Sequence, residues 1–589
     1  MISRFLRRGK TLPARFRLIA PALAACLVAP GAARAADARR GWPQFGRTPQ
    51  HTGESPALAQ PLETILADVV YDPFVDAMKA ESQGDPLAHY PAPLADETGV
   101  YMAFKSGTWT GFGNWETLTW SVKKLAWIGG RLEVVWSFDS DWKPEPLALA
   151  GWEPLFQPAI SGDDVFVPGL GGTVFRVSRE TGQALERINP FADLDPSRYV
   201  AGGLAVGPQG SVVYDVVGLT GADQTAPIEG AWLVRVTGSV SQRVDFAALV
   251  PGAPAADAPC QGTFSSDQAP LPPSPDAVPP TVPCGAQRPG LNAVPAISPD
   301  GTIYIVSRAQ GSDRYGYLVA VRADLTPAWA ASLRGRLSDG CGVLIPYDGS
   351  RFGCRPGAKT GVDPATNDAP AGRVNDAGTS SPAILPDGSV ILGVYTSYNY
   401  ARGHLFEFDS TGNLRATYDF GWDITPAVVP REGSFGIVLK DNHYFTASGT
   451  DYYDVTLLDP DLSPVWSYRS TNTESCVRQS DGSVACVSDH PTGFEWCVNQ
   501  PAVDAAGRIY LNSEDGTLYA FDPSGAVVGS LFIDTALGAA YTPIVIGPDG
   551  LLWAQNNGHL FAIGAPRFPR GAPGRPAGPP APARRVGPR

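Results

Sequence analysis

The stretch that decides the fold is QPAVDAAGRIYLNSEDGTLYAFDPSG, residues 500–525. It opens on Pro-Ala-aliphatic and contains two β-rich runs, at 507–511 and 517–521, each bounded by Gly, Asp or Pro. Short apolar and aromatic runs between such residues are typical of strands. The pair Asp515-Gly516 supplies the positive φ that a tight hairpin turn needs. The stretch therefore predicts a small antiparallel sheet.

The same unit recurs along the chain, and we count eight copies. Six are clear and two, the first and the third, are weaker; they begin at Pro93, Pro158, Leu204, Pro295, Pro382, Pro426, Pro501 and Pro543. A four-stranded sheet of this size cannot bury both of its faces alone. Stacking such sheets radially buries the faces and leaves only short edges. We therefore predict an all-β fold, a single eight-bladed β-propeller of four-stranded antiparallel blades, over residues 36–564.

The ends of the repeat region predict how the ring closes. The last copy stops at Gly564 without a fourth strand, and residues 64–71 (TILADVVY) form a strand that belongs to no copy. We predict that this strand is the outer strand of the last blade. The alternative is a stray strand on another blade.

The two termini have compositions of their own. Residues 1–35 combine a basic start, an apolar run at 18–30 and an Ala-x-Ala cleavage site, which predicts a signal peptide and a periplasmic or secreted protein. The alternative is a lipoprotein anchored through Cys26, because Leu-Ala-Ala-Cys resembles a lipobox. No later segment is apolar enough to predict a transmembrane span in the mature chain. Residues 565–589, rich in Pro, Gly, Ala and Arg, predict a disordered tail.

The charge of the chain bears on its partners. The formal net charge is −13, and because seven cationic residues lie in the first 35 and six in the tail, the body at 36–564 is near −26. Such a body repels phosphate backbones and argues against nucleic acid as a partner. The same charge also favours solubility, and we expect a monomer.

Seven cysteines follow the signal peptide, and export makes disulfides plausible. The candidates are Cys260, Cys284, Cys341, Cys354, Cys476 and Cys486. The partners within the group 476, 486 and 497 stay open, and the odd count leaves one thiol free or paired between chains. No histidine or cysteine spacing predicts a metal site. A calcium loop is conceivable at 363–376, where Asp and Asn gather, but a solvated loop is favoured.

Half of the 14 tryptophans lie between residues 109 and 152. Blade packing accounts for some of them. The run at 106–115, SGTWTGFGNW, is polar and rich in Gly, so we expect a loop that displays Trp109 and Trp115. These two residues are our candidate binding loop for a protein or glycan ligand.

The repeat resembles that of the pyrroloquinoline-quinone-like (PQQ-like) propellers, in its Pro-Ala-aliphatic start, its Asp-Gly middle and its Leu-Tyr-Ala-Phe-Asp end. The segments WPQFGR at 42–47 and HTG at 51–53 are similar to the start common in that family, and Trp136, Trp329 and Trp466 stand where its repeats close with Trp. Its alcohol dehydrogenases hold PQQ and calcium beneath adjacent cysteines, and this chain has no Cys-Cys pair.

The resemblance implies a fold that serves dehydrogenases and scaffolds alike. We favour an exported, non-catalytic binding or scaffold protein with no cofactor and no catalytic residues, acting on an unknown protein or glycan ligand. A PQQ- and calcium-dependent oxidoreductase is the first alternative, and a carbohydrate-binding or carbohydrate-active propeller is the second.

Overall fold

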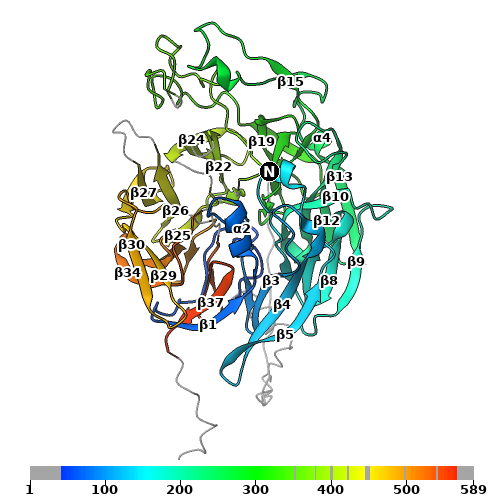
Figure 1. Ribbon diagram of the computed structural model, residues 1–589. Coiled ribbons are helices and arrows are strands. Elements are labelled where there is room, and N and C mark those ends of the chain that lie inside the picture. Colours follow the sequence, from blue (N-terminus) through cyan, green and yellow to red (C-terminus); the bar gives the residue numbers. More distant parts are fainter. Residues whose placement is uncertain are drawn as a thin grey trace, which may run out of the picture.

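The computed structural model describes residues 41–350, 353–378, 380–397, 402–420, 424–444, 451–496, 499–538 and 542–566. Eight antiparallel sheets stand around one axis, as predicted (Figure 1). We name them blades A to H in chain order. The predicted signal peptide, Cys26, Cys497 and the tail beyond residue 566 lie outside the described residues.

The strands of each blade are given below in order from the axis outward. Blades A to D are β2–β5 (Leu94–Asp96, Gly99–Gly107, Leu118–Ile128, Arg131–Asp139), β6–β9 (Ala159–Ser161, Asp164–Pro168, Val174–Ser178, Ala184–Ile188), β10–β13 (Arg198–Val206, Val212–Leu219, Ile228–Thr237, Val240–Asp245) and β17–β20 (Ala296–Ile297, Ile303–Ala309, Ser312–Val321, Pro327–Ser332), with β16 (Gln287–Pro289) added to the edge of β18. Blades E to H are β21–β24 (Ala383–Ile384, Val390–Ser397, Arg402–Phe408, Leu414–Phe420), β25–β28 (Ala427–Arg431, Ser434–His443, Tyr452–Leu458, Pro464–Arg469), β31–β34 (Ala502–Val503, Ile509–Asn512, Thr517–Phe521, Val527–Phe532) and β35–β37 (Val545–Ile546, Leu552–Asn556, His559–Gly564) followed by β1 (Thr64–Val70).

The predicted closure of the ring is confirmed. β1 pairs with β37 in antiparallel register, from Thr64 opposite Gly564 to Val70 opposite His559. Blade H is thus built from both ends of the repeat region, and the first and last segments of the ring hold each other.

Three tryptophans pack against turns of the following blade and so join neighbouring blades. Trp136 of blade A donates its Nε1 hydrogen to the carbonyl oxygen of Arg179 in blade B at 3.1 Å, and its ring lies against Gly182. Trp329 of blade D and Trp466 of blade F make the same contact with the blade that follows each of them, against Gly412 and Gly525. A side chain on these glycines would meet the indole, because their Cβ positions lie within 2.7 Å of ring carbons. The Asp-x-x-Gly turn is therefore part of the packing between blades.

The segment at 42–60, which we call the lead-in, closes one end of the ring. It hydrogen-bonds to blades A to H in order: Trp42 N to Ala95 O, Ile160 N to Pro43 O, Val206 N to Gln44 Oε1, Ile297 N to Pro49 O, Ile384 N to Gln50 O, Val428 N to Thr52 O, Val503 N to Gly53 O and Gln60 N to Gly550 O. These contacts fall where the inner strands end. We call this end the floor and the opposite end the mouth.

All long connections lie at the mouth, because each joins an outer strand to the inner strand of the next blade. Within the described residues they hold three short α-helices, α2 (Val75–Glu81), α3 (Leu147–Ala150) and α4 (Phe246–Leu249), and the 3-10 turn η4 (Ser266–Gln268). The 3-10 turn η1 (Trp115–Thr117) lies in the hairpin loop between β3 and β4. The turns η2 (Leu170–Gly172) and η3 (Pro208–Gly210) lie within blades B and C. In Figure 1, α2 lies near the centre of the ring.

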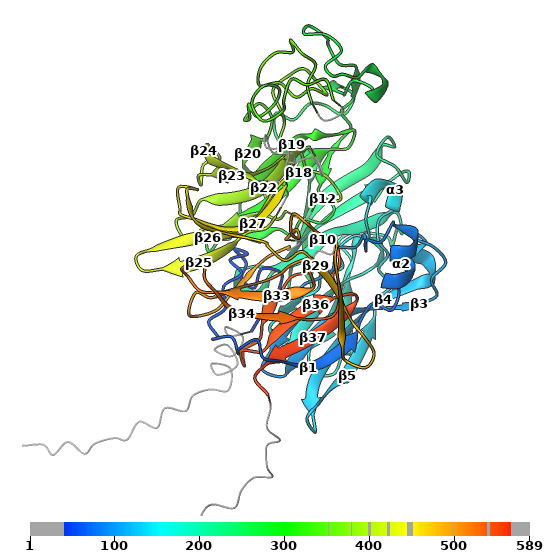
Figure 2. The same ribbon diagram turned by 60° about the vertical axis from the view of Figure 1, so that its left-hand side comes forward.

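The two cysteine-bracketed excursions leave the ring together and form a knob, residues 251–286 and 336–372 (Figure 2). The first contains β14 (Pro259–Gln261) paired with β15 (Thr281–Pro283). Backbone bonds join the two parts, Phe264 N to Ala365 O at 2.9 Å and Arg355 N to Leu271 O at 2.8 Å. The apolar cluster inside the second part is small, so its disulfide supplies much of the constraint. A further hairpin, β29 (Glu474–Arg478) with β30 (Val484–Ser488), extends between blades F and G.

Candidate functional site

Side chains from opposite sides of the ring meet on the axis at the mouth. His89 precedes blade A, and Ala377 precedes blade E, which is the opposite blade. The His89 ring nitrogens Nδ1 and Nε2 lie 3.0 and 3.2 Å from the carbonyl oxygens of Glu153 and Ala377. The ring also stacks on Trp152 at 5.3 Å. His89, Trp152 and Ala377 are all buried, so protein atoms fill the axis here. Burial lowers the pKa of His89 to about 4.

A buried lysine ties the closure strand to blade A. The Lys105 ammonium lies 2.7 Å from Asp72 Oδ2 and 2.7 Å from Glu153 Oε2. Asp72 follows β1, and its carboxylate also accepts the hydroxyl hydrogen of Tyr90 at 3.0 Å. Burial alone would lower the pKa of Lys105, but the two carboxylates raise it above its ordinary value. Lys105 is therefore a permanent cation that holds the last blade against the first.

A second buried cluster joins the crossovers around blade D. Asp376 accepts hydrogens from both terminal nitrogens of Arg288 at 2.7 Å and from Arg308 Nη1 at 2.9 Å. Burial opposes ionisation, but the two guanidinium groups hold the pKa of Asp376 below its ordinary value. Glu145 lies near this cluster, fully buried, and burial raises its pKa to about 8. Among the described residues, neither oxygen of its carboxyl group has a hydrogen-bond partner.

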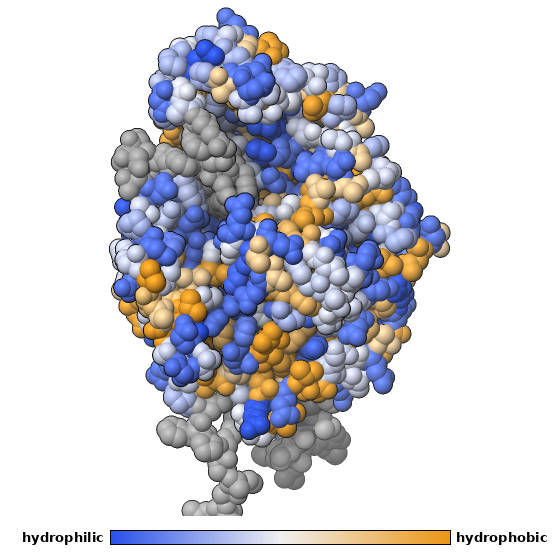
Figure 3. Space-filling view, in the orientation of Figure 1, coloured by the Kyte–Doolittle hydropathy of each residue, from blue (hydrophilic) through white to orange (hydrophobic). Residues whose placement is uncertain are grey.

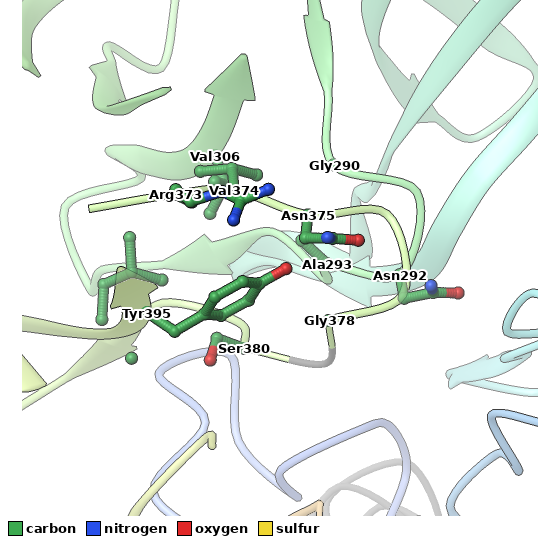
Figure 4. Close-up of a pocket in the computed structure, with 12 residues that line it drawn as sticks. Gly290, Asn292, Ala293, Val306, Arg373, Val374, Asn375, Gly378, Ser380 and Tyr395 are labelled. Carbon is green, nitrogen blue, oxygen red and sulfur yellow. The ribbon is translucent and has the colours of Figure 1, made fainter. Parts of the chain in front are cut away.

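A narrow hollow, part of it open to solvent, lies between blades D and E (Figure 4). Its apolar wall comes from Ala293, Val306, Val374 and Leu392. Its polar wall comes from Asn292, Arg373, Asn375, Ser380 and Tyr395. In Figure 4, Arg373 and Ser380 lie on opposite sides of the Tyr395 ring. The face in Figure 3 is hollowed between the knob and the rest of the mouth.

Arg373 is the charged group of this hollow. Its Nε donates to Asp313 Oδ2 at 2.9 Å, and Nη2 donates to the same oxygen. Its guanidinium carbon lies 5.7 Å from the centre of the Tyr395 ring. Burial opposes ionisation of Asp313, but Arg373 and its neighbours lower the pKa of that carboxyl to about 2. The Ser380 hydroxyl is buried and has no partner among the described residues.

The predicted display of tryptophans is wrong for Trp115. This side chain is 5% exposed and packs edge-on against Phe112 and Trp120. Trp109 is half-buried, stacks on Phe74 and donates its Nε1 hydrogen to Glu81 at the end of α2. Glu81 also accepts the backbone hydrogen of Phe112 at 2.7 Å, so α2 anchors this loop, and composition alone did not reveal that contact. A binding role for the loop stays a prediction.

The candidate cysteines form three disulfides, Cys260–Cys284, Cys341–Cys354 and Cys476–Cys486. The pairing that the sequence left open is therefore Cys476 with Cys486. Among the described residues, the one group of His, Cys, Asp and Glu close enough to hold a metal is Glu474 with these two cysteines, whose sulfurs are already joined.

The stretch at 363–376 is neither a solvated loop nor a cluster of free acids. Asp376 is buried against two arginines, and Asp363 lies 3.4 Å from Arg314. Asn367 donates to the carbonyl oxygens of Pro275 and Ala277 and so joins the two parts of the knob. No motif in the sequence contains Arg288, Arg308 or Arg373. Their pairing with acids far away in the chain has no local pattern that would have revealed it.

No family model and no curated protein matches the chain. Among solved structures, the quinohemoprotein alcohol dehydrogenase of Comamonas testosteroni is similar, with a TM-score of 0.50, 11% identity and coverage of 92% of this chain and 84% of that one. A europium-containing methanol dehydrogenase has a TM-score of 0.48 at 12% identity, covering 88% and 89%. BamB of Moraxella catarrhalis has a TM-score of 0.38 at 10% identity, covering 85% and 98%.

At these identities the likeness concerns the fold alone. The chain has the fold of the PQQ-like propellers, and the resemblance predicted from the repeats is confirmed at that level. Within the part of the chain that the structure describes, no helix is both long and apolar enough to cross a membrane.

Proposed function

We propose that this protein is an exported, non-catalytic binding or scaffold protein that presents its mouth to a protein or glycan ligand. The long connections and the hollow all lie at that end, while the lead-in occupies the other. Three disulfides are consistent with an oxidising compartment.

The filled axis is the observation that carries the non-catalytic part of the proposal. A quinone of the PQQ type is a flat, multi-ring group, so it needs an open chamber between the blades. Here His89, Trp152 and Ala377 meet on the axis and are buried. The residues present do not fit the group at this place, and we derive no step through it.

The charges at the mouth support the same proposal. A calcium ion needs several uncommitted oxygen ligands. Asp72 and Glu153 are committed to Lys105, and Asp376 is committed to two arginines. Glu145 is largely protonated at neutral pH because its pKa is about 8. A protonated carboxyl is a poor calcium ligand.

The test is reconstitution of the purified full chain with PQQ and calcium, followed by desalting and absorbance spectroscopy. We expect no stoichiometric retention of the quinone. A matched control is Trp152→Ala, which removes one of the rings on the axis and asks whether space alone limits binding. One quinone retained per wild-type chain, with calcium-dependent dehydrogenase activity, would overturn the proposal in favour of the oxidoreductase alternative.

A further inference from the structure

The hollow between blades D and E has the two walls that a small amphipathic ligand needs. Ala293, Val306, Val374 and Leu392 offer apolar surface on one side. Arg373, Asn375, Ser380 and Tyr395 offer polar groups on the other. Binding sites for small molecules commonly combine an apolar lining with a few placed polar groups. The hollow therefore suits a short apolar body that ends in one polar group.

Hydrogen-bond donors dominate the polar wall. Arg373 donates through Nε and Nη2 to Asp313, which leaves Nη1 for another acceptor. Asn375 uses its oxygen to accept from Ala377 N at 2.8 Å, which leaves its amide hydrogens as donors. The Ser380 hydroxyl is buried and without a partner among the described residues. A buried hydroxyl left in this state costs about 1–3 kcal/mol, so a ligand that accepts its hydrogen is favoured.

The electrostatic balance beside the hollow is positive although the protein body is acidic. A connected group of buried and half-buried side chains holds four guanidinium groups against three carboxylates: Arg288, Arg308, Arg314 and Arg373 with Asp313, Asp363 and Asp376. Glu145, the next acid along, does not cancel the excess, because burial raises its pKa to about 8. One uncompensated positive charge next to a cavity lined by donors favours an anion.

We propose that this hollow binds the carboxylate of a small organic ligand, with the acid group toward Arg373, Asn375 and Ser380 and the apolar body toward Val306 and Leu392. The inference deepens the proposed function and rests on it. The carboxylate can belong to a free acid or to the carboxyl end of a peptide chain, and both present the same chemistry to the hollow.

The probes are butyrate and butyramide, which have nearly the same shape but differ in charge. Isothermal titration of the full chain at constant ionic strength should give a dissociation constant for butyrate on the order of 1 mM. Butyramide should bind at least about tenfold more weakly, because it lacks the charge. Tighter binding of acetyl-Gly-Val than of butyrate would assign the carboxylate to a peptide end, and equal or weaker binding would assign it to a free acid.

Variants place the site. Ser380→Ala should weaken butyrate binding about three- to tenfold, the loss expected for one hydrogen bond. Arg373→Lys keeps the charge but loses the planar donor set, and it should weaken binding at least about tenfold. Ser524→Ala, in an exposed turn of blade G, is the matched control and should bind like wild type. If Arg373→Lys fails to fold, Ser380→Ala carries the test.

Three outcomes would each overturn the inference: equal binding of butyrate and butyramide, no binding of either at 50 times the expected dissociation constant, or wild-type affinity in Ser380→Ala. These outcomes leave the non-catalytic proposal standing. PQQ itself carries carboxylates, so its retention has two readings. Displacement by butyrate assigns the quinone to the hollow, whereas retention in excess butyrate assigns it to the axis and refutes the proposed function.

Discussion

Replacing Lys105 with Met should destabilise the contact between the last blade, H, and the first, A. The substitution keeps the length of the side chain but leaves Asp72 and Glu153 buried without their cation. The side chains of the three residues are at most 5% exposed, so water cannot replace the lost partner. Breaking a buried ion pair by removing one member costs about 3–5 kcal/mol.

The assay is urea unfolding followed by tryptophan fluorescence at pH 7. Lys359→Met is the matched control, because Lys359 makes a surface pair with Asp276 at 3.3 Å in which the side chains are 55% and 93% exposed. Such a pair contributes about 0–1 kcal/mol. Lowering the pH to 5 should shrink the deficit of Lys105→Met, since burial raises the pKa of Glu153 and its abandoned carboxylate then takes up a proton. The wild-type contribution of Lys105 should stay constant over this range, because a raised pKa means that it is lost only above pH 10.5.

A loss below 1 kcal/mol in Lys105→Met, or a loss that does not change between pH 7 and pH 5, would refute this reasoning. It would mean that the two carboxylates are hydrated or protonated in the native protein, and that the seam between blades H and A is held by other contacts.

Three further predictions follow from single contacts. His404 lies between Asp339 and Asp419, which raise its pKa to about 9 against the opposing effect of burial. Wild-type stability, measured by thermal unfolding, should therefore fall between pH 6.5 and 9, and His404→Gln should abolish this fall. Gly412→Ala should lower the free energy of unfolding by more than about 2 kcal/mol, because the new methyl meets Trp329. The control Gly433→Ala, with a similar positive φ and no neighbour within 4 Å, should lower it by about 1 kcal/mol. Equal losses would contradict the packing role of the Trp329–Gly412 contact. Mild reduction followed by alkylation and mass spectrometry should label Cys486 and Cys476 before the other paired cysteines, which are fully buried; simultaneous labelling of Cys341 would contradict this order.

Much of the fold was predictable because each blade repeats the same local rules. Asp515-Gly516 and its counterparts mark turns, and the runs between them mark strands. Closure was predictable for a simple reason: the last copy lacked a strand, and residues 64–71 offered one. The lead-in was recognisable by resemblance, but its contacts with all eight blades depend on backbone groups that no composition reveals.

The candidate site was much less predictable. Trp115 looked exposed because its neighbours are small and polar, yet its indole is buried, and Glu81 of helix α2 accepts hydrogens from Phe112 N and Trp109 Nε1 in the same loop. The buried ion pairs join residues up to 88 positions apart, such as Arg288 and Asp376. Periodicity describes each strand separately, and it does not say which loops cross at the mouth. The sites therefore depend on the arrangement of loops, which only the folded ring determines.

The most direct test of the filled axis is a crystal structure grown in the presence of PQQ and calcium. We predict density for the His89 imidazole stacked on Trp152 at the centre of the mouth, with the Ala377 carbonyl beside it and no quinone on the axis. A quinone lying among the eight inner strands, with His89 displaced, would contradict the account.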